Sequence, residues 1–185
     1  SGLVAAGGLA AALSTADGLL LTISNALSHD LYYQMVDPRA SSARRIMLSK
    51  MLLLLVALGA ASVAAQRPAN ILFLVSAAFS LAASAFFPAL VLGIFWKRAN
   101  RWGASTGMLA GLGVCFWYMV TTHPWLREQF GVTGPVTLWW DILPISAGVF
   151  GVPVGFAVIA AVSLLTPAPS AESQALVDRL RYPRL

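Results

Sequence analysis

Charge is scarce in this sequence, and long stretches of the chain carry none. Only 10% of the residues are charged and 58% are hydrophobic, whereas soluble domains usually have about 25% charged and about 45–50% apolar residues. Uncharged stretches separate the charged residues at 18–29, 51–66, 68–96, 102–126 and 142–171. A helix needs about 20 apolar residues to cross a bilayer. This distribution therefore excludes a soluble domain and predicts an integral membrane protein in contact with the lipid bilayer.

Residues that build catalytic and metal centres are also rare. There is one cysteine, Cys115, and there are two histidines, so an internal disulfide is excluded. No Ser-His-Asp, zinc-ligand or phosphate-loop pattern occurs, and we therefore expect neither an enzyme nor an organic cofactor. The net charge of +5 does not indicate a nucleic-acid partner, because the basic residues lie in short loops between apolar segments, as topology signals do.

Five apolar segments predict an all-α membrane protein with five transmembrane helices. They span about 3–28, 44–65, 70–95, 102–122 and 142–165, which is near the length that a bilayer requires. They form a predicted transmembrane region over 1–166, and a tail follows over 167–185. The chain begins at Ser1 rather than at methionine, which favours a piece of a longer protein.

Basic residues predict the orientation of these helices. Arg67 and Arg127 fall on one predicted side. The other ten basic residues fall on the opposite side: Arg39, Arg44, Arg45, Lys50, Lys97, Arg98, Arg101, Arg179, Arg181 and Arg184. Cytoplasmic loops carry the excess of Lys and Arg. We therefore expect a multi-pass protein of the plasma membrane with a cytoplasmic C-terminal tail.

The first predicted helix has one face of small and polar residues. At about 100° per residue, this face gathers Gly7, Gly8, Ala11, Ser14, Thr15, Gly18, Thr22 and Asn25. Leucines and Ile23 fall on the opposite side. Small residues let helix backbones approach closely, so we expect this face to pack against protein rather than lipid.

Ala11, Ser14 and Thr15 are spaced to place three oxygens at one point of that face. The carbonyl of Ala11 and the hydroxyls of Ser14 and Thr15 come together because the residues are at i, i+3 and i+4. Hard cations choose oxygen ligands, so the three residues form half of a candidate sodium site, to be completed by another helix. The alternative is that the hydroxyls bond to carbonyls one turn earlier and only pack.

Asp17 is an ionisable residue inside the same span. Such residues usually face protein or water, because burial of a charge in lipid is costly. One interpretation is a relay for protons or cations, or a gate. The other is a structural hydrogen bond to a neighbouring helix.

Two further patterns concern helix packing. Ser76, Ser80 and Ser84 form a stripe at i, i+4 and i+8 that is a candidate permeation path, with interhelical hydrogen bonding as the alternative. Glycines at four-residue spacing predict close helix contacts, with an oligomer contact as the alternative. They are Gly103, Gly107 and Gly111 in one span and Gly151 and Gly155 in another.

Several of these residues lie in runs that resemble the sodium/solute symporter family, and most closely its branch of acetate permeases and related monocarboxylate transporters. The runs are AALSTADGLLL at 11–21, SHDLY at 28–32, AFSLAAS at 78–84, FFP at 86–88 and LGIFWKR at 92–98. The resemblance covers roughly residues 2–111, and the last span and the tail are not diagnostic.

The resemblance implies a five-plus-five inverted-repeat transporter fold, of which this chain would be the C-terminal part. Its first three helices would be core helices eight to ten, and the last two would be peripheral. The family's sodium site uses a small residue and a hydroxyl pair on core helix eight, which correspond to Ala11, Ser14 and Thr15. Carbonyls of the broken first core helix complete that site. That helix and the sixth, which bind substrate in such folds, have no counterpart in this chain.

The resemblance therefore implies symport of sodium, as the coupling ion, with a small organic anion of the short monocarboxylate class, such as acetate. The missing N-terminal helices of the same transporter would be the partners of this chain. The alternative is a structural or regulatory membrane subunit that does not transport.

Overall fold

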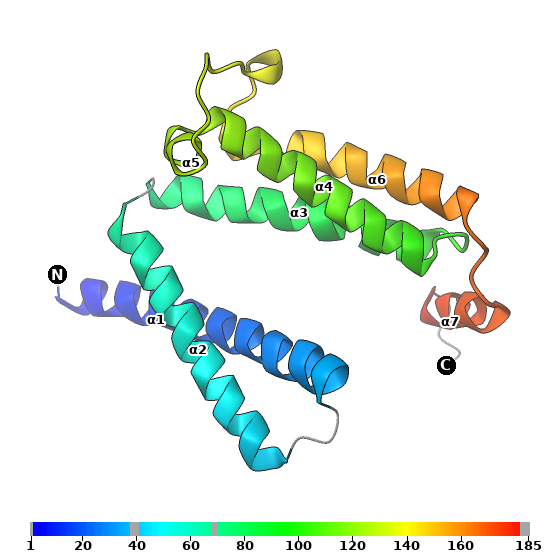
Figure 1. Ribbon diagram of the computed structural model, residues 1–185, viewed down its shortest axis with the longest axis horizontal. Helices are drawn as coiled ribbons and strands as arrows, with labels where there is room; N and C mark the ends of the chain where they lie inside the picture. Colours follow the sequence, from blue (N-terminus) through cyan, green and yellow to red (C-terminus); the bar gives the residue numbers. More distant parts are fainter. Residues whose placement is uncertain (1, 38–40, 68–69, 182–185) are drawn as a thin grey trace. The chain divides into compact units, whose positions relative to one another are not determined.

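The computed structural model describes residues 2–37, 41–67 and 70–181, and within these ranges the regular structure is entirely helical. Figure 1 shows the order of the helices along the chain. The elements are α1 (Gly2–Asn25), the π-helix η1 (Ala26–Val36), α2 (Ser42–Ala65), α3 (Ile71–Phe95), α4 (Arg101–Thr122), α5 (Pro124–Gln129), the 3-10 turns η2 (Trp139–Asp141) and η3 (Pro144–Ser146), α6 (Gly148–Leu165) and α7 (Ala171–Arg181).

Five segments in the described part of the chain are long and apolar enough to cross a membrane. They are Gly2–Asp30, Ser42–Ala65, Ile71–Phe95, Arg101–Thr122 and Pro144–Leu165. This confirms the expectation of an all-α protein with five transmembrane helices. Of the basic residues that predict the orientation, Arg39 and Arg184 lie outside the described residues.

Three segments have more helical structure than their sequence indicates. The first helix continues past Ser28 as η1, although the polar pair His29 and Asp30 looks like a helix end. The segment 123–141, which lies between two predicted spans, contains α5 and η2, and the tail, which has no predicted span, contains α7. Short polar helices such as these lack the long apolar run on which the detection of spans depends.

The chain divides into two compact units, Ser1–Pro68 and Ala69–Leu185. In the first unit, α1 packs on α2 around Ser24. The side chain of Ser24 is fully buried, and its hydroxyl donates to the carbonyl of Ser49 at 2.7 Å. At the same end of the helix pair, the guanidinium of Arg45 lies 3.6 Å from the ring centre of Tyr33.

In the second unit, α3, α4 and α6 lie side by side (Figure 1). The glycines of α4 form the seam with α6. A Cβ atom on Gly103 would collide with the Ser163 hydroxyl, one on Gly107 with Ile159, and one on Gly111 with the carbonyls of Ser84 and Gly151. We find that this glycine spacing is used for close packing within the chain, as the pattern predicts.

Pro88 of α3 lies at the point where all three helices meet. Proline has no N–H, so the carbonyl of Ser84, four residues earlier, loses its helical hydrogen-bond donor. The backbone of Gly111 packs directly on this carbonyl, and a Cβ atom on Gly155 would lie 3.3 Å from it. Glycine Cα–H groups are weak donors to carbonyl oxygens, so the seam supplies partial compensation for the missing bond.

The loop between α3 and α4 forms hydrogen bonds with the C-terminal end of α6. The guanidinium of Arg98 donates to the carbonyls of Leu164 and Thr166, at 3.4 and 2.9 Å. The side-chain oxygen of Asn100 caps α4 by accepting from the N–H of Gly103, and its amide donates to the hydroxyl of Thr166 at 2.6 Å. Free carbonyls at a helix end need such donors, and Arg98 and Asn100 satisfy them here.

Candidate sodium site on α1

The three candidate sodium ligands lie on one turn of α1, and all three residues are exposed. The hydroxyl of Thr15 donates to the carbonyl of Ala11, with 3.2 Å between the oxygens. Two ligands held at 2.3–2.6 Å from a hard cation and at right angles to each other would be about 3.3–3.7 Å apart. The spacing of the two oxygens is therefore close to what a shared cation requires.

The same hydrogen bond is also the one that the packing alternative describes. Thr22, two helical turns further along α1, makes an equivalent bond to the carbonyl of Gly18 at 2.8 Å. Ser14 differs, because its hydroxyl has no hydrogen-bond partner among the described residues. The geometry leaves the sodium assignment of Ala11, Ser14 and Thr15 a prediction.

Asp17 is exposed on α1, two residues after Thr15. None of the described residues forms a hydrogen bond or an ion pair with its carboxylate. A carboxylate inside a membrane span requires a partner or water. The partner of Asp17 therefore has to come from beyond the described residues or from solvent.

The serine stripe of α3 is engaged in contacts within the second unit. The hydroxyl of Ser80 donates to the carbonyl of Ile145 at 2.9 Å, and that of Ser84, which is fully buried, donates to the carbonyl of Ser80 at 2.7 Å. Ser76 is half-buried. The bond of Ser80 to η3 is of the kind that the interhelical alternative describes, whereas the bond of Ser84 lies within α3. The permeation path stays a prediction.

Arg98 is predicted from the sequence only as a topology signal, and no prediction was made for Asn100, so their contacts with the end of α6 were missed. One signal was present in the sequence. Asn100 immediately precedes an apolar span, which is the position of a helix N-cap. Nothing in the sequence indicates that the other end of its amide reaches Thr166.

Residues 1–111 match the family model of the sodium:solute symporters. The chain belongs to the sodium:solute symporter family. The match includes the candidate site on α1, the whole of α2 and α3, and the first part of α4.

Members of this symporter family align with most of this chain. It is 58% identical to an uncharacterized symporter of Cupriavidus necator over 98% of the chain and 26% of the relative. It is 35% identical to the sodium/proline symporter of Escherichia coli over 90% of the chain and 29% of the relative. It is 28% identical to a monocarboxylic acid transporter of Corynebacterium glutamicum over 83% of the chain and 28% of the relative.

The chain thus spans about a quarter of the length of these curated relatives. No solved structure matches it. The family and the five apolar helices show a multi-pass membrane protein of the symporter class.

Proposed function

We propose that this chain is the C-terminal portion of a sodium-coupled symporter for a small organic solute, with a short monocarboxylate such as acetate as the first candidate. It acts in transport and not as an enzyme. Membership of the sodium:solute symporter family supports coupling to sodium. The identity to a monocarboxylic acid transporter supports the substrate class.

The observation that carries the proposal is the exposed polar face of α1. Sodium would bind the carbonyl of Ala11 and the hydroxyls of Ser14 and Thr15, which lie on one exposed turn. Hydroxyl and small residues on a membrane helix face protein rather than lipid. Helices from the remainder of the symporter would therefore cover this face and supply the other oxygens.

Asp17 and the serine stripe complete the proposed pathway. Asp17 would act as a relay for ions or as a gate, since its carboxylate is exposed next to the sodium ligands. Ser76 would line a permeation path, and Ser80 and Ser84 would border it from their packed positions in α3.

Location and orientation follow from the same proposal. The symporter would lie in the bacterial plasma membrane with its tail in the cytoplasm, because the basic residues gather at the tail side. Its partners would be the lipid bilayer, the small anionic substrate and the other helices of the transporter.

Replacement of the sodium ligands in the full-length symporter tests the site. We expect Ser14→Ala and Thr15→Ala each to raise the sodium concentration for half-maximal acetate uptake at least about tenfold, the equivalent of about 1.4 kcal/mol of sodium binding. Thr22→Ala is the matched control, because Thr22 makes the same kind of backbone hydrogen bond on the same helix. Unchanged sodium dependence in the Ser14 and Thr15 variants would sink the assignment.

A second candidate substrate is proline, which the identity to a sodium/proline symporter favours. Uptake of labelled acetate and labelled proline into proteoliposomes, each driven by a sodium gradient, separates the two. Uptake of acetate alone supports the first candidate, and uptake of proline alone replaces it. Uptake of neither, with the protein folded, favours a structural or regulatory subunit that does not transport.

A further inference from the structure

The second unit has a cavity of about 590 Å³ at the end where α3 meets α4. Its walls are of two kinds. Ala89 and Gly93 of α3, with Ile159 of α6, form an apolar wall, and Asn100, Arg101 and Ser173 belong to a polar rim. A cavity with one apolar and one polar end suits a ligand that is itself amphiphilic.

The polar rim has positive charge that the described residues do not neutralise. Lys97 is paired with Asp178 at 2.8 Å. Arg98, the next residue in the chain, does not line the cavity; its Nη2 donates to two backbone carbonyls, and its buried Nη1 has no hydrogen-bond partner among the described residues. Arg101 is exposed, and no described carboxylate pairs with it.

The helix that begins at this rim adds to the positive potential. Arg101 is the first residue of α4, and no acidic residue occurs in the first turn. A helix N-terminus carries a partial positive charge and favours an anion. An arginine there does not stabilise α4, so its position is better suited to a negative ligand at the cavity.

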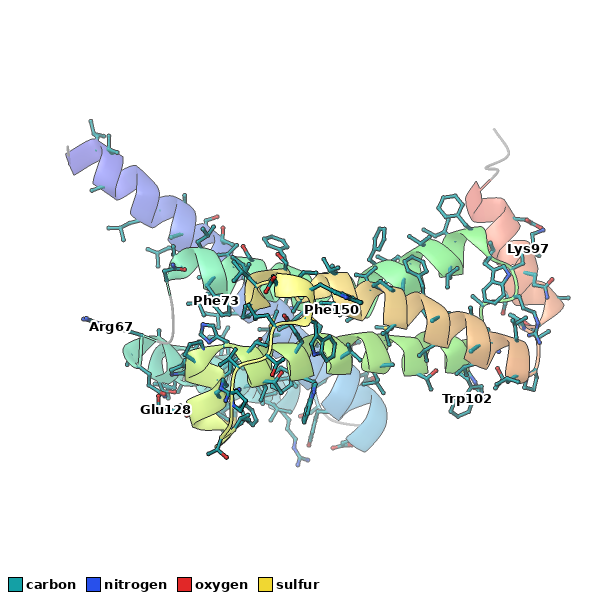
Figure 2. All side chains as sticks on the ribbon, turned by 90° about the horizontal axis from the view of Figure 1, so that it is seen from above. Arg67, Phe73, Lys97, Trp102, Glu128 and Phe150 are labelled. Atoms are coloured by element: carbon teal, nitrogen blue, oxygen red, sulfur yellow. The ribbon has the colours of Figure 1, made fainter. Side chains whose placement is uncertain are left out.

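An exposed tryptophan on the cavity wall favours a position at the membrane interface. Trp102 lines the cavity and is 56% exposed, and tryptophan is enriched where lipid tails meet headgroups. Figure 2 shows Lys97 and Trp102 at the same end of the second unit, with Lys97 beside α7. From this rim the apolar wall extends along α3, where a Cβ atom on Gly93 would meet nothing within 4 Å.

We propose that this cavity binds one anionic phospholipid, with the phosphate at Arg101 and an acyl chain along Gly93. Charge at the rim selects an anionic headgroup over a neutral one. The apolar wall selects a lipid over a free anion, because a soluble phosphate compound would leave Ala89 and Gly93 uncovered.

Lipid binding to the purified full-length symporter, followed by native mass spectrometry, tests this site. The probes are phosphatidylglycerol, the neutral lipid phosphatidylcholine, and free glycerol 3-phosphate. We expect Arg101→Gln to weaken phosphatidylglycerol binding about fivefold, the effect of one basic residue at the membrane surface. We expect Gly93→Leu to weaken it at least as much, because leucine fills the space of the acyl chain.

Matched controls separate the site from general effects. Gly113→Leu introduces the same side chain at a position of α4 where a Cβ atom also meets nothing within 4 Å and which does not line the cavity. Arg67→Gln removes one positive charge from a residue of the first unit that does not line the cavity. Both controls should bind phosphatidylglycerol like the unchanged protein.

Each contrary result overturns the proposal in a distinct way. Equal binding of phosphatidylcholine means that the cavity is only an apolar groove. Equal binding of glycerol 3-phosphate, insensitive to Gly93→Leu, means that it is only an anion site. Phosphatidylglycerol binding that survives both Arg101→Gln and Gly93→Leu places the lipid elsewhere.

Discussion

The two units of this chain bury their helices to different degrees. In the most apolar 18 residues of α1 and of α2, none are buried, whereas 39% are buried in α4 and 28% in the last span. The second unit closes on a glycine seam, while the first is joined through one buried serine contact. The unit that holds the candidate sodium ligands is therefore the one whose packing is incomplete without further protein.

The largest effect should come from the seam of the second unit. A Cβ atom on Gly111 would collide with the carbonyls of Ser84 and Gly151, so Gly111→Ala should cost about 2 kcal/mol or more of stability. Gly113→Ala, two residues along α4, meets open space and should stabilise by about 0.5–1 kcal/mol, because alanine favours helix over glycine. Thermal unfolding of the full-length protein compares them. Equal shifts would mean that the seam is not closely packed.

A smaller effect is expected in the first unit. Ser24→Ala removes the buried hydrogen bond to Ser49 and should cost about 0.6 kcal/mol, the average for such bonds between membrane helices. Ser62→Ala is the control, since its hydroxyl bonds within α2 to Gly59 at 2.7 Å and is exposed. If Ser24→Ala destabilises the protein as much as Gly111→Ala, the contrast between the units fails.

The smallest expected effect is the pH dependence of stability that His123 causes, at the end of the second unit where α4 ends. Burial lowers the pKa of His123 from its ordinary value of 6.5; its ring stacks on Phe73 at 3.9 Å, and its Nδ1 has no partner. The unfolded chain therefore takes up a proton at His123 before the folded protein does, so stability present above pH 6.5 is lost below it.

Unfolding temperatures measured between about pH 7.5 and about pH 5.5 check this sign. The unchanged protein should lose more stability on acidification than His123→Gln, in which the other titrating groups are unaltered. The opposite order would show that protonated His123 is favoured in the folded state.

Some features of the fold can be predicted from the sequence and others cannot, and both outcomes have physical reasons. The five spans follow directly from the length of the apolar runs, and the spacing of Gly103, Gly107 and Gly111 indicates close packing. The glycine spacing does not indicate which helix packs on these residues, because a glycine face suits any helix. Only the structure shows that α6 occupies it.

The candidate site is predictable only as far as one helix determines it. The helix period places Ala11, Ser14 and Thr15 together, and the structure keeps the oxygens of Ala11 and Thr15 at 3.2 Å. The remaining ligands depend on tertiary contacts with other helices, which local periodicity does not encode. The extension of the first helix through His29 and Asp30 was missed for a similar reason, because both residues are polar and lie beyond the apolar run.

Pro88 has a consequence for how the protein is made. A membrane helix inserts first and associates with other helices afterwards, and at insertion the carbonyl of Ser84 would face lipid without a donor. The partial compensation comes from the Cα–H of Gly111, which is synthesised later in the chain. The Ser84 carbonyl of α3 therefore gains this contact only after α4 has been made, and a nascent chain that stops before α4 would hold the carbonyl in the bilayer without it.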